Sequence, residues 1–320
     1  MNFQGLQKIE RAEFYIELAF RAARKQGDKI YMRTSGEQFL RIKKTEIERV
    51  KEFAKTIREK MDAITKNFPS IDGMPEFYQE LVRTTIDYDQ LKKSLGAVKW
   101  ASEHVRIFAR KYEQKMRGAR EQGTLKRQST EFYGRASSLL KQIKSNLAYL
   151  EESRGIMKTY PTIKTELFTV AITGFPNIGK STLLSKLTPA KPEIKNYAFT
   201  TKNLNQGYAQ YGIHKIQFVD TPGVLNRHQM NAIEQQAYLI MKYLANLIVY
   251  VIDLTEPYSI KEQEKLLKTL AEYDKPIVIY LSKTDIIDAA TTAKAKKKYR
   301  AITSVGDLRA RIEKVMQQGR

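Results

Sequence analysis

The sequence predicts an α+β chain of two domains: an antiparallel helical bundle over residues 1–160, then an α/β domain with a mostly parallel sheet over 161–320. In the first half, apolar residues recur every three or four positions, which is the period of a helix that buries one face. After "YPTIK" (160–164) the pattern changes to short runs of β-branched and aromatic residues, separated by helical or loop segments. That alternation is typical of a parallel sheet covered by helices. A length of 320 residues suits two domains.

Three helical stretches are predicted in the first half. An apolar stripe at 47–64 marks one long helix, a second stripe at 91–112 marks another, and a third follows at 132–150. The segment 117–128 carries two glycines and is interpreted as a turn. Long helices with short connections predict an antiparallel bundle. The apolar stripes and Trp100 are interpreted as its core.

Four strands are predicted in the second half, at "LFTVAITG", "HKIQFVD", "NLIVYVID" and "KPIVIYLS". Beyond residue 288 the pattern predicts a helix over 289–299, a short strand over 300–304 and a terminal helix over 307–318.

Basic residues are concentrated in one part of the bundle. The chain has a formal net charge of +21, and residues 92–158 alone hold 16 Lys and Arg against 6 Asp and Glu. Helices that are basic on one side suit phosphate neutralisation, so we expect an RNA-facing surface; a merely solvated face is the alternative. DNA is not an expected partner.

The chain has no cysteine and three histidines, which excludes a disulfide scaffold, a cysteine nucleophile and a thiolate metal site. The sequence contains no run of about 18 apolar residues, and no apolar signal segment follows the first methionine. We expect a soluble, cytoplasmic protein without stable membrane association.

A phosphate-binding loop is predicted at Gly174–Ser181, "GFPNIGKS", between a strand and a helix. Its glycines let backbone N–H groups surround a phosphate chain, and the helix N-terminus adds positive potential. Lys180 is expected to reach the β- and γ-phosphates, and the Ser181 hydroxyl to ligate Mg²⁺. The nucleotide contacts expected from this segment are Asn177, Ile178, Gly179, Lys180, Ser181 and Thr182.

A second phosphate-end motif is "DTPG", Asp220–Gly223, after the strand "IQFVD". Asp220 is expected to hold the Mg²⁺ shell, and the Gly223 N–H to meet the γ-phosphate. In "NYAFTTKN" (196–203), Thr200 or Thr201 can supply a second hydroxyl to Mg²⁺, and Thr201 is favoured. The predicted metal set is therefore Ser181, Thr201 and Asp220.

Base selection is predicted at "SKTD", Ser282–Asp285. Asp285 can accept two hydrogen bonds from guanine N1 and N2, a donor pair that adenine lacks. The Lys283 stem is expected to lie along the base. The Thr303–Ser304 backbone is placed to donate an N–H to guanine O6.

The order GFPNIGKS, YAFTTK, DTPG, SKTD resembles that of Obg-like GTPases. Together with "PEFYQELVRTTIDYDQLKKSLGAVKWA" (75–101), "EFYGRASSLLKQIKSNLAYLEESR" (131–154) and "IEQQAYLIMKYLANLIVYVIDLTE" (233–256), it resembles the nucleolar GTP-binding protein 1 family, in its short archaeal-type form. The resemblance covers about residues 66–288. It implies a P-loop GTPase domain that binds GTP or GDP with Mg²⁺, and a role in assembly of the large ribosomal subunit, with the helical domain on ribosomal RNA.

The catalytic set is predicted to be Lys180, Thr201, Gly223 and Asn177. The residue after Gly223 is Val224, whose apolar side chain cannot orient an attacking water, so slow intrinsic hydrolysis is expected. GTPases that resemble this one often use an Asn at the place of Asn177 to hold K⁺; the alternative is that Asn177 braces the loop. A monomer is expected. The family's guanine motif usually begins with Asn, where this chain has Ser282.

Other readings stay open on the sequence alone. An ATPase is disfavoured by Asp285. A membrane-surface G protein, or another RNA-associated one, would use the same basic helices. A nucleotide-degenerate RNA-binding protein is kept open by Ser282.

Overall fold

The computed structural model describes residues 3–189, 193–195, 204–221, 232–255 and 258–318. The chain separates into two compact units. One comprises residues 3–73 and 82–158, and the other comprises residues 74–81 with the described residues from 159 onward. The fold class is confirmed: helices come first, and an α/β unit with a mostly parallel sheet follows.

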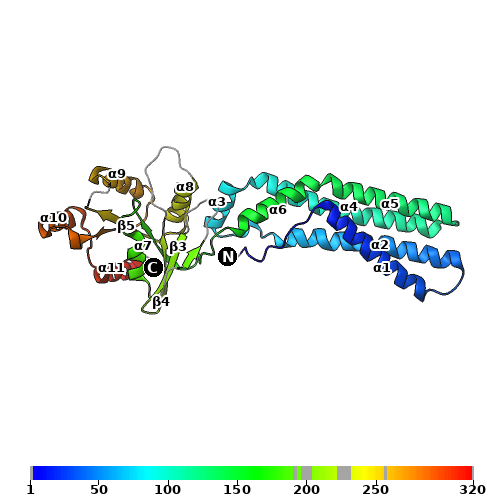
Figure 1. The fold of residues 1–320 in the computed structure, drawn as a ribbon, viewed down its shortest axis with the longest axis horizontal. Coiled ribbons are helices and arrows are strands. Elements are labelled where there is room, and N and C mark those ends of the chain that lie inside the picture. Colours follow the sequence, from blue (N-terminus) through cyan, green and yellow to red (C-terminus); the bar gives the residue numbers. More distant parts are fainter. Residues whose placement is uncertain (1–2, 190–192, 196–203, 222–231, 256–257, 319–320) are drawn as a thin grey trace. The chain divides into compact units, whose positions relative to one another are not determined.

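The first unit is a helical bundle. Its helices are α1 (Ala12–Arg33), α2 (Gln38–Asn67), α4 (Tyr88–Gly118), α5 (Gln122–Gln142) and α6 (Lys144–Lys158). Helix α1 packs on α2, α2 on α4, and α4 on both α5 and α6 (Figure 1). The short segment η1 (Ile71–Gly73) precedes α3 (Glu76–Thr85).

Aromatic side chains hold the bundle core together. The Phe53 ring lies 4.9 Å from the Phe20 ring, 5.8 Å from Phe132 and 5.3 Å from Tyr133, centroid to centroid. Phe53 and Phe132 are fully buried. Edge-to-face packing of aromatic rings stabilises a fold by more than the burial of their apolar area alone. Here these ring contacts connect α1, α2 and α5.

Three details of the predicted bundle are wrong. The turn expected over 117–128 is only three residues long, because α4 runs to Gly118 and α5 starts at Gln122. The long last helix is two helices, separated at Ile143, whose N–H bonds to the Leu140 carbonyl in a tighter turn. Trp100 is 41% exposed rather than buried in the core.

The second unit is built on a six-stranded sheet of order β2-β3-β4-β1-β5-β6. The strands are β1 (Phe168–Thr173), β2 (Glu193–Lys195), β3 (Leu204–Tyr211), β4 (His214–Asp220), β5 (Leu247–Asp253) and β6 (Ile277–Ser282). Strands β4, β1, β5 and β6 run parallel, while β2 and β3 form an antiparallel edge. Every residue of β5 is buried, as expected for a central parallel strand.

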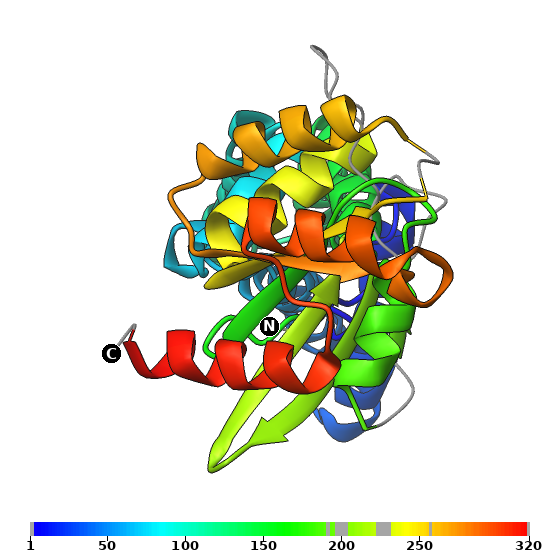
Figure 2. The same cartoon turned by 90° about the vertical axis from the view of Figure 1, so that its left-hand side faces the viewer.

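Helices cover both faces of this sheet. Helices α7 (Lys180–Leu187) and α11 (Val305–Gln318) pack against each other. Figure 2 shows α11 on one face, and α8 (Ala232–Leu239) with α9 (Ile260–Ala271) on the other. The remaining elements are η2 (Ile240–Leu244), a π-helical turn, η3 (Thr284–Ile286) and α10 (Ala289–Tyr299).

The strand predicted over 300–304 is reduced to one bridging residue. Arg300 ends α10 with φ +49°, a left-handed conformation. Only Ile302 then pairs with β6, beside Tyr280. The predicted helices on either side of this bridge are present.

Tyr78 connects α3 to the segment that enters the sheet. Its hydroxyl donates toward the carbonyls of Pro161 (2.9 Å) and Ile163 (3.2 Å) and accepts from the Ile163 N–H (2.9 Å). Burial raises the pKa of Tyr78 to about 12, so this hydroxyl stays protonated and keeps its donor at physiological pH.

Replacing Tyr78 by Phe is expected to lower the free energy of unfolding by about 1–3 kcal/mol, because it leaves buried backbone groups unpaired. Urea denaturation measures the change. Tyr88→Phe is the matched control, since its hydroxyl pairs with Asp72 in an exposed position, and a shift of under about 0.5 kcal/mol is expected there. Equal effects of both variants would contradict a special role for Tyr78.

Candidate nucleotide-binding site

The phosphate loop joins β1 to α7, and its backbone conformation requires glycine. Gly174 has φ +145°, and a Cβ there would lie 2.4 Å from the Ile178 Cδ1 and 2.8 Å from the Val251 carbonyl oxygen. Ile178 is fully buried and anchors the loop against the sheet, whereas Asn177 is exposed with φ +61°. Gly179, with φ +93°, immediately precedes the helix. The loop therefore ends at the N-terminus of α7, where backbone N–H groups attract anions.

Lys180 is folded back over this loop. Its side chain is buried, and its Nζ donates to the Phe175 carbonyl at 2.7 Å. The ammonium group thus lies against the loop backbone. Thr182 is exposed in the first turn of α7.

Ser181 and Asp220 are brought together from α7 and β4. The Ser181 Oγ donates to the Asp220 Oδ2 at 2.5 Å, and the Asn205 Nδ2 donates to the same oxygen at 3.2 Å. Burial raises the pKa of Asp220, and the hydrogen bond from Ser181 and the Lys180 charge act in the opposite direction. The other carboxylate oxygen, Oδ1, is buried without a hydrogen-bond partner among the described residues.

This pair fits Mg²⁺. The ion prefers hard oxygen ligands, and a hydroxyl next to a buried carboxylate with a spare oxygen supplies them. A divalent cation would also compensate the cost of burying the Asp220 charge.

Asn205 is a site residue that the sequence analysis missed. The antiparallel register of β3 and β4 places it directly opposite Asp220. No local motif marks it. Only the pairing of two strands, which the sequence did not reveal, puts its amide beside the carboxylate.

Two predicted phosphate-end residues, Thr201 and Gly223, lie outside the described residues, as does Val224. Their predicted roles stay predictions.

The guanine-motif residues gather at the carboxyl ends of β5 and β6. Ser282 is buried, and its Oγ donates to the Ile252 carbonyl at 3.2 Å. Its Cβ lies 3.6 Å from the position that a Cβ on Gly179 would take. Ser282 therefore lies beside the phosphate loop, and Asp285 follows in η3 as an exposed residue.

Thr303 and Ser304 reach the same edge of the sheet. The Leu281 N–H donates to the Ile302 carbonyl at 2.9 Å, which holds the segment alongside β6. The Ser304 Oγ accepts from the N–H groups of Gly306 (3.1 Å) and Asp307 (3.4 Å) and so caps α11. Both residues are thus near the guanine motif.

Asp253, which the sequence analysis also missed, fixes Lys283. Its Oδ2 lies 2.6 Å from the Lys283 Nζ, and its Oδ1 accepts from the Thr255 N–H (2.9 Å) and hydroxyl (2.7 Å). Lys283 has φ +51°, a strained conformation for lysine. The ion pair therefore ties the Lys283 side chain to the carboxyl end of β5.

Burial alone would raise the pKa of Asp253, but the hydrogen bonds from Lys283 and Thr255 outweigh burial and lower it. A carboxyl whose folded pKa is depressed stabilises the fold above its unfolded pKa of about 4, and loses that contribution as pH falls through the folded value.

Replacing Asp253 by Asn is expected to cost about 1.5–3 kcal/mol of stability at pH 7, because a charge-assisted network is lost. The difference from the wild type should shrink as pH falls below about 4. Chemical denaturation across pH measures both quantities. Asp274→Asn, at an exposed left-handed position that asparagine tolerates, is the control. A stability difference between Asp253→Asn and the wild type that does not change with pH would contradict the assigned contacts of Asp253.

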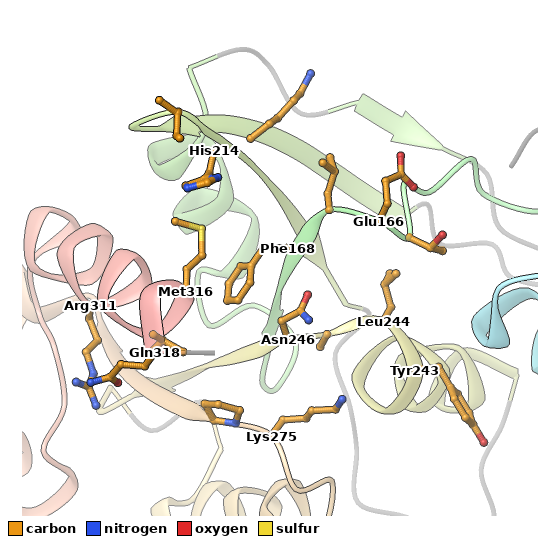
Figure 3. A pocket seen from close by; sticks show the side chains of 17 residues that line it. Glu166, Phe168, His214, Tyr243, Leu244, Asn246, Lys275, Arg311, Met316 and Gln318 are labelled. Atoms are coloured by element: carbon orange, nitrogen blue, oxygen red, sulfur yellow. The ribbon is translucent and has the colours of Figure 1, made fainter. Parts of the chain in front are cut away.

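A cavity of about 900 Å³ lies at a different place in this unit. Its lining includes Phe168, His214, Asn246 and Lys275, which lie at or just before the amino ends of β1, β4, β5 and β6 (Figure 3). Nucleotides bind α/β sheets at the carboxyl ends of the strands. The cavity therefore lies at the opposite edge from the phosphate loop.

Within the described ranges, no helix is both long and apolar enough to cross a membrane. Over that same part of the chain, no three His, Asp or Glu side chains group in a way that could hold a metal ion.

Two family models match the chain. The NOG1 N-terminal helical domain matches residues 3–164, and the model described as 50S ribosome-binding GTPase matches residues 169–283. An uncharacterized protein of Methanocaldococcus jannaschii is 43% identical, over 78% of this chain and 71% of its own length.

Eukaryotic relatives match as well. Nucleolar GTP-binding protein 1 of Drosophila melanogaster is 30% identical over 89% of this chain and 44% of its own length. The protein of that name from Candida glabrata is 33% identical over 79% of this chain and 40% of its own length. The chain thus spans less than half the length of these two relatives. The helical-domain model covers half of the chain, the GTPase model follows it, and the phosphate loop lies between a strand and a helix as expected. This chain therefore belongs to the nucleolar GTP-binding protein 1 family and carries a P-loop GTPase domain.

Proposed function

We propose that the chain binds GTP with Mg²⁺, hydrolyses it slowly, and uses the nucleotide state to control its binding to ribosomal RNA during assembly of the large ribosomal subunit. In this proposal residues 1–160 form the RNA-facing domain and residues 161–320 the GTPase domain. The observation that carries it is the convergence of the phosphate loop, the Ser181–Asp220 pair and the guanine motif at one edge of one sheet.

The phosphate end would be held by groups already in place. Lys180 would exchange its bond to the Phe175 carbonyl for the β- and γ-phosphates, at the N-terminus of α7. Ser181 and Asp220, with Thr201, would hold Mg²⁺, which neutralises phosphate charge when bound. The Gly223 N–H would then meet the γ-phosphate and distinguish GTP from GDP.

The base would be held by Asp285, whose carboxylate accepts from guanine N1 and N2, with Lys283 along the ring and the Thr303–Ser304 backbone at O6. Asp253 would keep Lys283 in position.

Hydrolysis would be slow without help, because Val224 cannot orient water. Asn177, exposed on the loop, would hold K⁺ beside the phosphates, where a cation stabilises the developing charge. Replacing Na⁺ by K⁺ is expected to raise the turnover rate about tenfold or more, and Asn177→Ala to remove that rise. Phosphate release measures both; equal rates in the two salts would contradict a K⁺ site.

The RNA-facing surface would be the basic segment 92–158. Of its sixteen Lys and Arg residues, thirteen are exposed: Lys92, Lys93, Lys99, Arg110, Lys111, Lys115, Arg117, Arg120, Lys126, Arg127, Arg135, Lys141 and Lys144. An exposed field of this sign favours a polyanion. The protein would act as a monomer in the cytoplasm.

Sedimentation of the tagged full chain with ribosomal particles tests the whole proposal. The lysate is run in potassium buffer with a non-hydrolysable GTP analogue and, in parallel, with GDP. Comigration with large subunits or their precursors only in the GTP state is the expected result. If the chain stays at the top of the gradient in both states, the ribosomal assignment is wrong.

A further inference from the structure

One face of α4 is exposed along most of its length and carries an aromatic pair at its centre. Its residues recur every three or four positions; we call them the α4 stripe: Lys93, Ala97, Trp100, His104, Ile107 and Lys111. Trp100 is 41% exposed and Ile107 45% exposed. The two side chains lie two turns apart on the face of α4 that is turned away from the core.

The indole of Trp100 is held in place by its neighbour one turn along. The Trp100 and His104 rings lie 4.4 Å apart, centroid to centroid, at 38°. The His104 Nδ1 lies 3.0 Å from the Trp100 carbonyl oxygen, which fixes the imidazole. The tilted His104 ring therefore supports the indole, and the rotamer entropy of the pair, which we call the platform, is already restricted.

Among the described residues, four of the six cations on this stretch of α4 have no carboxylate partner. Arg106 is tied to Glu103, and Lys92 lies 3.8 Å from Asp72. In contrast, Lys93, Lys99, Arg110 and Lys111 form no ion pair within the described part of the chain. The stripe from Lys93 to Lys111 is about 27 Å long at 1.5 Å per residue, enough for several nucleotides.

We propose that the α4 stripe binds single-stranded RNA by stacking an unpaired base on Trp100, while the lysines at its two ends neutralise the flanking phosphates. This rests on the proposed RNA-binding function and specifies which form of RNA the bundle takes. An A-form duplex is bound through its backbone and offers no free base face, so an exposed indole among cations suits an unpaired base. A lipid surface would instead need a broad apolar face, and Glu103 lies beside this one.

Trp100 is the only tryptophan in the sequence, so its emission reports directly on this surface. The full chain is titrated with a short unstructured oligoribonucleotide and, separately, with a blunt duplex of the same length. Saturable quenching by the single strand but not by the duplex is expected. Trp100→Ala should weaken single-strand binding about 5- to 150-fold, and Trp100→Phe should retain most of the affinity.

Two controls separate stacking from charge and from folding. Phe14→Ala removes a 49%-exposed aromatic on α1, outside the basic segment, and should leave affinity unchanged. The double variant Lys93→Gln, Lys111→Gln should weaken the binding of both RNA forms. It should also reduce the slope of log affinity against log salt concentration by about two in magnitude. Thermal midpoints of all variants check that each one is folded.

The outcomes distinguish this proposal from the one it rests on. If the chain binds RNA with unchanged Trp100 emission, or if folded Trp100→Ala binds the single strand as tightly as the wild type, stacking is wrong and RNA binding stands. Should neither RNA form bind at low salt, both proposals fail.

Discussion

Replacing Lys180 by Ala is expected to weaken the binding of both GTP and GDP by about 100-fold or more. The Lys180 side chain is buried, and its ammonium group donates to the Phe175 carbonyl of the phosphate loop. A charge-assisted hydrogen bond contributes about 1.5–3 kcal/mol, and a lysine that reaches two phosphates makes more than one of them. In a site shielded from water, the lost charge is poorly replaced by solvent.

Lys186→Ala is the matched control for this variant. Lys186 lies in the last turn of the same helix with its side chain exposed, so it loses the same charge without touching the loop. Titration with a fluorescent guanine nucleotide measures both affinities. If Lys180→Ala binds within about threefold of Lys186→Ala, the loop does not hold phosphate in the way proposed.

The phosphate loop could be predicted from the sequence because its geometry is local. Gly174 and Gly179 have positive φ, and side-chain atoms within the loop leave no room for a Cβ at Gly174. Residue type and spacing therefore determine the conformation by themselves. The four parallel strands were predictable for a similar reason, since buried strands are continuous apolar runs.

Asn205 and Asp253 could not be predicted in this way. Asn205 meets Asp220 only through the β3–β4 register, and β3 ("LNQGYAQY") has too few β-branched residues to identify it as a strand. Asp253 meets Lys283 only because β5 and β6 are parallel neighbours in register. Contacts across strands depend on pairing, which a single sequence does not contain.

The prediction for Trp100 failed for a different reason. The helical periodicity of α4 already indicated an exposed position, but tryptophan was assigned to the core because of its residue type. The buried positions Leu91, Val98, Val105 and Tyr112 recur every seven residues. Trp100 is two positions after Val98, about 200° around the helix, and so faces away from the core. The position of a residue around the helix therefore predicts its burial better than the general tendency of tryptophan to be buried.

Replacing Asp285 by Asn is expected to weaken GTP binding by about 100-fold and to improve binding of xanthosine triphosphate. The carboxylate in η3 would accept two hydrogen bonds from guanine, and an amide offers a donor where guanine N2 also donates. Xanthine carries a carbonyl at that position, so the amide donor matches it. ATP should bind weakly to both proteins, since adenine lacks the donor pair.

Asp288→Asn serves as the control, because Asp288 caps α10 by accepting from the Thr291 N–H at 2.8 Å, and asparagine caps equally well. Competition among the three triphosphates measures selectivity in each protein. The Ser282 hydroxyl already donates to the Ile252 carbonyl, so the first position of the motif can contribute less to guanine affinity. The effect of Asp285→Asn should therefore be large in this protein. Guanine selectivity that survives Asp285→Asn would mean that the base is recognised elsewhere, and the assignment of the motif would then be wrong.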